Sequence, residues 1–234
     1  MNNQTQNNLL NLVKRNYDEI ATDFSETRKR NPMPLWGELV KYVQFVEDGE
    51  VVLDAGCGNG RILKAFGNKK IKYLGVDQNE KLLEKARELY PDREFIQGDI
   101  LELGKIPQIN FDYVFCVAAL HHIPGKKLRI DVLRQLKNKI KPDGEILITV
   151  WNMWPHVKFC KLVFKFFLLK IIKKNNMDFG DILFDWNNSV KRYYHVFTKR
   201  ELKDICKKAG LNIKKIYKDE YNYYLILSKQ GKNT

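Results

Sequence analysis

Apolar and polar positions follow two different spacings along the chain, and these spacings predict a mixed α/β protein. The run FDYVFCVAAL (111–120) is almost continuously apolar, which is typical of a strand buried on both faces of a parallel sheet. In LLNLVKRNYDEIATDF (9–24), apolar residues recur with the period of one helix face. The same analysis predicts strands over residues 51–54, 72–77, 94–99, 111–120, 144–151, 211–217 and 223–229. It predicts helices over residues 9–24, 35–46, 79–90, 127–140 and 199–208, with a further one beginning at about residue 61.

The order of these elements predicts one domain with an open, doubly wound sheet, because strands and helices alternate along the chain. The last two strands are joined by so short a turn that we expect them to run antiparallel. The fold class is therefore α/β, with a seven-stranded, mostly parallel sheet that has one antiparallel strand. Helices flank this sheet, and N-terminal helices and an inserted helical segment are added to it.

We divide the single domain into four parts: a helical cap (1–47), a core (48–151), a helical insertion or lid (152–190), and a C-terminal helix with a strand hairpin (191–234). The polar opening MNNQTQNN is expected to be frayed. TRKRNPMP (27–34) is expected to form a short basic loop between the first two helices.

Composition and charge narrow the class of protein. The four cysteines, Cys57, Cys116, Cys160 and Cys206, are far apart and include no C-x-x-C pair. This argues against a zinc knuckle and a disulfide framework, and it fits the reducing cytoplasm; no N-terminal run resembles a signal peptide. The formal net charge of +13 favours partners such as nucleic acid or anionic lipid, although a bias toward Lys and Asn explains it equally well. We expect a cytoplasmic protein without a bound metal.

A glycine-rich stretch, VVLDAGCGNG (51–60), follows the first predicted strand and is typical of a loop that binds a nucleotide-like cofactor. It is not a phosphate-binding loop, which would need Gly-Lys-Ser/Thr where residues 60–62 are Gly-Arg-Ile. It is not a dinucleotide-binding loop either, because the bulky Arg61 stands where that motif needs its third small residue.

Three carboxylates at the ends of predicted strands indicate the kind of ligand. Asp54 precedes the glycine loop and Asp77 ends the second strand, which suits a ligand with a cationic amine and a ribose diol. Asp99 lies beyond the third strand, where it could accept a hydrogen bond from the exocyclic amine of adenine. The alternative is that Asp54 or Asp99 merely braces a turn.

Four stretches of the chain, taken in order, form a specific combination of motifs: VVLDAGCGNG, YLGVDQNEKLLEKAR, FIQGDILEL and FDYVFCVAALHHI. Over residues 48–151 they resemble the class I S-adenosylmethionine-dependent methyltransferases. The resemblance implies a Rossmann-like class I methyltransferase fold and S-adenosyl-L-methionine as the cofactor. It places the amino acid part of the cofactor over the glycine loop, the ribose at the second strand, and the adenine beyond the third. The cofactor-binding residues that it implies are Asp54, Gly56, Cys57, Gly58, Asp77, Gln78, Asp99, Ile100, Val117 and Leu120.

Two flanking segments are distinctive as well, YDEIATDFSETRKRNPMPLW (17–36) and GDILFDWNNSVKRYYHVFTKRELKDICKKAGL (180–211). Together with ALHHI (119–123) and Trp151, they resemble the tRNA wobble-uridine carboxyl methyltransferases, a family that includes the methyltransferase domain of the human AlkB-homologue protein. This resemblance spans about residues 10–229. It implies an enzyme that esterifies the carboxymethyl group on carbon 5 of the first anticodon uridine, with the tRNA anticodon loop as partner. It also implies a small zinc-binding activator subunit as a possible partner. No feature of the sequence proves or excludes such a subunit.

Methyl transfer to a carboxylate makes modest demands, because this acceptor is already ionised at neutral pH and needs no strong base. The site has to hold it in line with the methyl group and to exclude water. Guanidinium groups can grip the carboxylate, a histidine can donate a hydrogen bond, and aromatic side chains can stack on the base. The expected acceptor-site residues are Arg28, His121, His122, Trp151, Arg192, Tyr193, Tyr194 and His195. For each the alternative is structural, and of the neighbours Tyr193 and Tyr194 one is expected to pack inward.

The segment HVKFCKLVFKFFLLKIIKK (156–174) departs from that family, because it combines six lysines and many apolar residues with no acidic residue. Lys158, Lys161 and Lys165 share one side of a predicted helix, and no apolar run is long enough to span a membrane. Three interpretations stay open: a lid with its lysines toward tRNA phosphates, a covering helix with a solvated face, or weak contact with a membrane surface.

Two other functions remain compatible with the motifs. One is a small-molecule O- or C-methyltransferase of the same class, against which the basic charge and the RYYH run argue only moderately. The other is a noncatalytic RNA-binding scaffold that has kept the fold, against which the intact glycine loop and its carboxylates argue.

Overall fold

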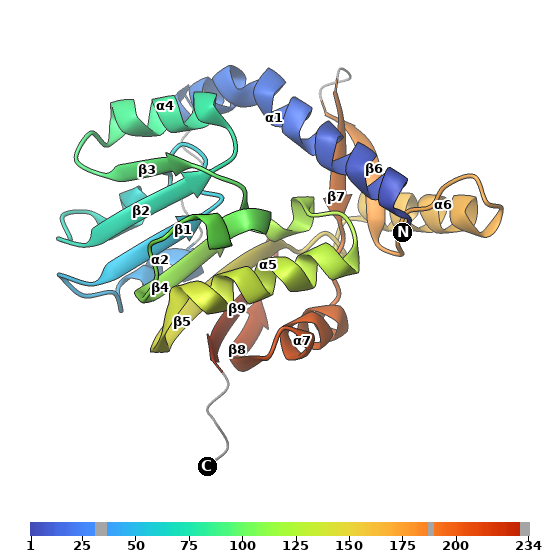
Figure 1. The fold of residues 1–234 in the computed structure, drawn as a ribbon. Coiled ribbons are helices and arrows are strands. Elements are labelled where there is room, and N and C mark those ends of the chain that lie inside the picture. Colours follow the sequence, from blue (N-terminus) through green and yellow to red (C-terminus); the bar gives the residue numbers. More distant parts are fainter. Residues whose placement is uncertain (31–36, 187–189, 230–234) are drawn as a thin grey trace, which may run out of the picture.

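A computed structural model gives the backbone over residues 1–30, 37–186 and 190–229, and the side chains over residues 1–19, 37–185 and 191–229. At its centre lies a seven-stranded sheet of order β3-β2-β1-β4-β5-β9-β8 (Figure 1). Its strands are β1 (Val51–Ala55), β2 (Lys72–Asp77), β3 (Glu94–Gln97), β4 (Phe111–Val117), β5 (Ile140–Trp151), β8 (Leu211–Lys218) and β9 (Asn222–Lys229).

The strand directions confirm the predicted fold class. Strands β1 to β5 pair in parallel, whereas β9 runs antiparallel to both of its neighbours, β5 and β8. The parallel strands need helical crossovers, while the short connection between β8 and β9 allows a hairpin. The carboxyl ends of β1 to β5 therefore meet at one edge, where open α/β sheets bind ligands.

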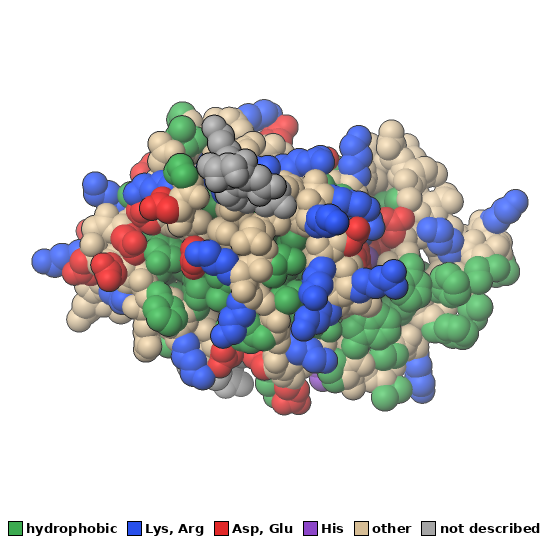
Figure 2. Space-filling view, turned by 90° about the horizontal axis from the view of Figure 1, so that it is seen from below, with side chains coloured by type: hydrophobic (Ala, Val, Ile, Leu, Met, Phe, Trp, Pro, Cys, Tyr) green, Lys and Arg blue, Asp and Glu red, His purple; other side chains and the backbone are tan. Residues whose placement is uncertain are grey.

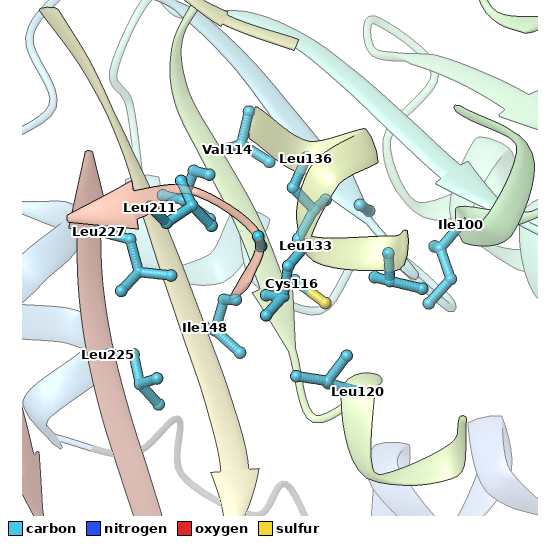
Figure 3. Close-up of a cluster of buried hydrophobic side chains, with 14 of the residues drawn as sticks. Ile100, Val114, Cys116, Leu120, Leu133, Leu136, Ile148, Leu211, Leu225 and Leu227 are labelled. Atoms are coloured by element: carbon cyan, nitrogen blue, oxygen red, sulfur yellow. The ribbon is translucent and has the colours of Figure 1, made fainter. Parts of the chain in front are cut away.

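Helices cover both faces of the sheet and bury alternate residues of each strand. Val114 and Cys116 of β4 pack with the face that carries α5 (Lys126–Lys139) and α7 (Lys199–Lys208), as Figure 3 shows for α5. Phe115, between them, packs on the opposite face. The elements on that side include α2 (Gly37–Val43), α3 (Leu63–Phe66) and α4 (Glu80–Leu89). The predicted cap of α4 is confirmed, because Asn79 Oδ1 accepts from the Leu82 amide at 3.0 Å.

The first helix is longer than predicted at both ends, since α1 runs from Asn3 to Arg30. The expectation of a frayed start is wrong. The Met1 ammonium lies 2.8 Å from an Asp178 carboxylate oxygen, and Gln6 Nε2 donates to the Pro124 carbonyl at 3.0 Å. These contacts hold the first turn against the rest of the domain. The expected loop over 27–34 is corrected as far as residue 30, which is helical; residues 31–36 lie outside the described part of the chain.

Two further departures concern strands. Strand β5 begins at Ile140 rather than at 144, because the Lys-Pro-Asp-Gly run stays extended beside a register shift between Phe111 and Tyr113. The second is a separate two-stranded antiparallel sheet of β6 (Asp181–Trp186) and β7 (Val190–His195), which was not predicted. The inserted helix α6 (Val157–Ile171) packs against β6. Over the described residues, no helix combines the length and apolar character needed to cross a membrane.

Candidate active site

The glycine loop after β1 is wedged between β2 and the end of β4. The Gly56 amide donates to the Val76 carbonyl at 2.7 Å. Gly56 has a φ of +80°, and a Cβ there would lie 2.9 Å from the Cβ of Ala119. Gly58 also has a positive φ, of +55°. Glycine is needed at Gly56 both for its positive φ and for the close approach of the Ala119 side chain.

Asp77 ties this loop to the end of β2. Its Oδ2 accepts from the Gly58 amide at 2.8 Å, and its Oδ1 accepts from the Asn79 amide at 2.9 Å. Burial raises the pKa of this carboxyl, while the two amide hydrogen bonds partly oppose that shift. Each carboxylate oxygen has a second lone-pair direction, so Asp77 can still accept from ribose hydroxyls.

Asp54 is placed deeper than the other two carboxylates. It is buried at the end of β1 and accepts from the Tyr73 hydroxyl at 2.9 Å. Burial raises its pKa to about 7, against the lowering effect of the tyrosine hydrogen bond. A cationic amine nearby would favour the ionised form of Asp54, so its position fits the expected cofactor. The hydrogen bond from Tyr73 also fits the structural alternative, in which Asp54 braces the turn.

The remaining cofactor candidates differ in how open they are. Asp99 Oδ1 accepts from the Leu101 amide at 2.8 Å and so caps the short helix η1 (Ile100–Lys105). This contact fits the alternative in which Asp99 braces a turn. Gln78 and Val117 are partly exposed near the ends of β2 and β4. Cys57 and Ile100 are buried, and Leu120 lies fully in the core rather than on an open surface.

Aromatic rings gather at the carboxyl end of β4 and β5. We call them the aromatic cluster: His121, His122, Trp151, Phe184 and Tyr194. The ring of Tyr194 on β7 stacks with three others of the cluster. Its centroid lies 5.3 Å from that of His121, 5.0 Å from that of Trp151 and 5.2 Å from that of Phe184. His121 also faces Trp151 at 5.1 Å. The cluster joins the end of the main sheet to the hairpin of β6 and β7.

Both histidines of this cluster are neutral at physiological pH. Burial lowers the pKa of His121 well below its usual value and that of His122 to about 3. The Trp151 amide donates to His121 Nδ1 at 3.5 Å, so the proton of this neutral ring is on Nε2. Within the described part of the chain, no group accepts a hydrogen bond from that buried Nε2. His121 is therefore an unpaired donor in a fully buried position.

The other face of β7 carries a different set of side chains. We call it the ionic cluster: Arg129, Asp181, Tyr193, His195 and Glu201. Asp181 Oδ1 accepts from the Tyr193 hydroxyl and faces His195 Nδ1, both at 2.7 Å. His195 Nε2 lies 2.9 Å from Glu201 Oε1, and Arg129 Nη2 lies 3.4 Å from the same oxygen. Tyr193 and His195 thus point away from Tyr194, because successive residues of a strand face opposite sides.

Helix α1 crosses the same end of the sheet, from α4 to β7 (Figure 1). Asn79 Nδ2 donates to Asp18 Oδ1 at 2.7 Å, the Tyr17 hydroxyl lies 2.8 Å from His122 Nε2, and Asn16 Nδ2 donates to the Lys191 carbonyl at 2.5 Å. Sequence reasoning missed Tyr17 and Phe184 as members of this region. Their only signal was that both belong to the two flanking segments already singled out.

The two predicted arginines lie on α1 and β7. Arg28 lies near the end of α1, and its side chain is outside the described residues. Arg192 is half-buried on β7, on the Tyr194 side, and pairs in register with Phe184. The structure thus brings His121, His122, Trp151 and Tyr194 together and separates them from Tyr193 and His195. Among the described side chains, no group of three or more His, Cys, Asp or Glu residues is arranged to hold a metal ion.

Known proteins that are similar to this chain are methyltransferases. The family model described as "Methyltransferase domain" matches residues 46–210. A tRNA (carboxymethyluridine(34)-5-O)-methyltransferase of Schizosaccharomyces pombe is 27% identical, with 91% of this chain and 94% of that protein covered. The protein of the same name in Saccharomyces cerevisiae is 32% identical, with 64% of this chain and 52% of that protein covered.

Solved structures agree on the fold. An S-adenosylmethionine-dependent methyltransferase of Methanosarcina mazei superposes with a TM-score of 0.67 at 19% identity, with 84% of this chain and 99% of that one covered. The expected Rossmann-like fold is thereby confirmed. The expected zinc-binding activator finds no support in the relatives' names, which describe methyltransferases.

Proposed function

This chain belongs to the methyltransferase domain family, and we propose that it uses S-adenosylmethionine to esterify the carboxymethyl group of a wobble uridine in tRNA. Two yeast relatives have this activity in their names, and one of them is covered almost completely. The enzyme class follows from the family, whereas the acceptor is our proposal. The observation that supports it is the neutral, buried His121, whose Nε2 has no hydrogen-bond partner among the described residues and lies within a cluster of aromatic rings.

The residues at the carboxyl edge fit the expected cofactor. The glycine loop leaves no room for a Cβ at Gly56, and Asp77 retains lone pairs for a ribose diol. When bound, S-adenosylmethionine supplies an electrophilic methyl group on a sulfonium. Asp77 would hold the ribose. Asp54 would attract the cationic amino group electrostatically. Gln78, Asp99 and Ile100 would flank the adenine.

The acceptor side has to position an anion and keep water out. His121 Nε2–H would donate a hydrogen bond to a carboxylate oxygen of the carboxymethyl group. Arg192 of β7 would bind the same carboxylate through its guanidinium. Arg28 is proposed for the same role. Neutral histidines suit this task, because a further positive charge at His121, added to the guanidinium, would overstabilise the anion and weaken its attack on the methyl group. Helix α1, tied to α4 and β7, would exclude water above the site.

An uridine of the anticodon loop can reach such a site. The base is single-stranded and can be splayed out at modest cost, and aromatic side chains such as Trp151 offer a stacking surface. The formal charge of +13 favours binding of the surrounding phosphates. The proposed reaction takes place in the cytoplasm, in keeping with the four cysteines, all of which are free thiols.

The test is methyl transfer from labelled S-adenosylmethionine to tRNA from a strain that lacks this modification, followed by digestion to nucleosides and mass spectrometry. We expect a base-labile methyl ester on a carboxymethylated uridine. Asp77→Ala should lose cofactor affinity, whereas Arg192→Ala should keep it and lose turnover. The exposed Arg134 offers a matched control, since Arg134→Ala should keep both. Cofactor binding without label in tRNA would instead favour a small-molecule acceptor, and full turnover by Arg192→Ala would refute the assigned acceptor site.

A further inference from the structure

Helix α6 has two apolar faces, and the described part of the chain covers only one of them. Its inner face packs onto the β6 and β7 hairpin through the buried Val163 and half-buried neighbours. Its outer side carries an exposed apolar stripe, which we define as Val157, Phe164, Leu168 and Ile171. These residues are spaced by seven, four and three positions, so they lie along one side of the helix. Their exposed fractions are 67%, 61%, 45% and 60%.

The stripe is extended by a second segment of the chain. Phe167, beside the stripe, is 38% exposed and meets the ring of Phe179 edge to face, with centroids 5.6 Å apart. Phe179 comes from the segment after the helix and is 54% exposed. Contiguous exposed apolar side chains of this size are uncommon on soluble domains and mark surfaces that contact a partner or a membrane.

Lysines border the stripe. Lys158, Lys161 and Lys165 are exposed and follow one flank of the stripe, as their spacing along the helix requires. Segment 156–174 holds six lysines and no acidic residue. Figure 2 shows hydrophobic side chains gathered with basic ones at the end of the molecule from which α6 projects in Figure 1. The surface is therefore both apolar and cationic.

We propose that the apolar stripe and lysine flank of α6 seat this protein on an anionic lipid surface. A helix of 15 residues lying flat presents the stripe to the boundary between headgroups and acyl chains, and the lysines reach lipid phosphates at the same depth. This proposal is independent of the acceptor chosen for methyl transfer. It makes the contact peripheral, because the helix does not cross the bilayer.

The combination of side chains selects this occupant over others. An RNA backbone would pair its phosphates with the lysines. It would leave the phenylalanine, leucine and isoleucine side chains in water, so their burial would contribute nothing to binding. A second copy of this chain would place one lysine flank against another unless its stripe were offset. An anionic lipid surface satisfies both features at once, because each lysine near it contributes attraction and each inserted apolar side chain contributes burial.

Vesicle flotation tests the proposal. One set of vesicles is phosphatidylcholine with about one third phosphatidylserine, and the other is phosphatidylcholine alone. We expect the purified full chain to float with the anionic vesicles only, and salt to weaken the binding. The double variant Phe164→Ser/Leu168→Ser should reduce vesicle affinity about tenfold or more with an unchanged melting temperature, since both side chains are already exposed.

A matched control removes exposed apolar side chains elsewhere. Phe45 and Ile109 are 70% and 58% exposed and lie outside α6, so Phe45→Ser/Ile109→Ser should float like the parent chain. Three results would overturn the proposal: no preference for anionic vesicles, equal flotation of the α6 double variant, or a solution dimer that dissociates in that variant while lipid binding persists. Loss of tRNA affinity in the α6 variant without loss of flotation would assign the surface to RNA instead.

Discussion

The two faces of β7 present opposite kinds of chemistry over a strand of six residues. One face contributes Tyr193 and His195 to the ionic cluster, where Asp181 alone has contacts with three partners. The other contributes Tyr194 to the aromatic cluster, where the histidines are neutral and His121 keeps an unused donor. On the first face charged and polar groups pair with one another, although Arg129 Nε has no partner among the described residues, and on the second face His121 Nε2 is unpaired in the same sense.

This difference indicates a division of labour within one strand. Paired charges hold the hairpin against α5 and α7, since removing the Arg129 guanidinium leaves the carboxylates of Asp181 and Glu201 without it. The aromatic face is held by ring contacts, in which no charged pair has to be kept together. Substitutions on the two faces should therefore separate stability from activity.

The largest expected effect is on the ionic face. Arg129→Met removes the buried guanidinium that lies 3.4 Å from Glu201 and 3.8 Å from Asp181. Because both carboxylates then lose a cationic partner in a buried site, we expect the free energy of unfolding to fall by about 3–5 kcal/mol. Urea unfolding followed by circular dichroism measures it.

The exposed Arg134 on the same helix is the matched control. It pairs with Asp131 at the surface, so Arg134→Met should change the free energy of unfolding by no more than about 0.5 kcal/mol. A similar small loss for Arg129→Met would mean that the ionic cluster does not hold the hairpin, and the comparison between the two faces would fail.

The next effect is on activity. His121→Phe keeps a ring of similar size in the aromatic cluster and removes the Nε2 donor, so we expect turnover to fall about 100-fold. The free energy of unfolding should change by less than about 1 kcal/mol, because the lost Trp151 contact is long and a buried unpaired donor disappears. Methyl transfer to tRNA and urea unfolding are measured on the same preparation.

The control for this variant is His156→Phe, which alters an exposed histidine outside the aromatic cluster. It should retain full turnover. If His121→Phe were as active as the parent chain, His121 would be a packing residue, and the aromatic face of β7 would have no more to do with the reaction than the ionic one.

The cofactor half of this site was accessible from the sequence because its determinants are local. The glycine loop, Asp77 and the Asn79 cap lie within thirty residues of one another, and the hydrogen bonds that order them span short stretches of chain. Strand ends in a parallel sheet also share one edge, so a motif at each end places its residues together. The same logic predicted the one antiparallel strand from the tight connection before β9.

The acceptor half was less accessible because its contacts are long-range. Tyr17 meets His122 across 105 positions of sequence, which no local spacing encodes. The pleat predicted that Tyr193 and Tyr194 point in opposite directions, but not that both would be buried. Both are buried because α1 covers one side of the hairpin, where Leu9 and Val13 meet Tyr193, and α6 covers the other. The hairpin itself escaped prediction, since its strands gain their burial from those two helices.

A smaller effect is expected in the pH dependence of stability. The pKa values of His121 and His122 are lowered in the folded state, so below about pH 6.5 the unfolded chain takes up protons that the folded chain does not. Stability from these groups is therefore present above that pH and is lost as pH falls, by about 1.4 kcal/mol per pH unit for each histidine. His121→Phe should remove one histidine's share of this slope between about pH 6 and 4, whereas Arg134→Met should leave it unchanged. Equal slopes in the parent chain and His121→Phe would contradict a neutral aromatic face.

The smallest effect concerns the hydrogen bond by which Tyr17 of α1 reaches the aromatic cluster. Tyr17→Phe removes the hydrogen bond to His122 Nε2 but keeps the ring, which meets His122 edge to face with centroids 5.3 Å apart. We expect a loss of about 1 kcal/mol in the free energy of unfolding and faster hydrogen exchange in α1, because one buried imidazole nitrogen loses its partner. The variant keeps the ring of Tyr17 and the packing of α1 against Tyr193, so exchange in α7 should not change. Faster exchange in both helices would show that the two faces of β7 are coupled, and the division between a structural and a functional face would then be too sharp.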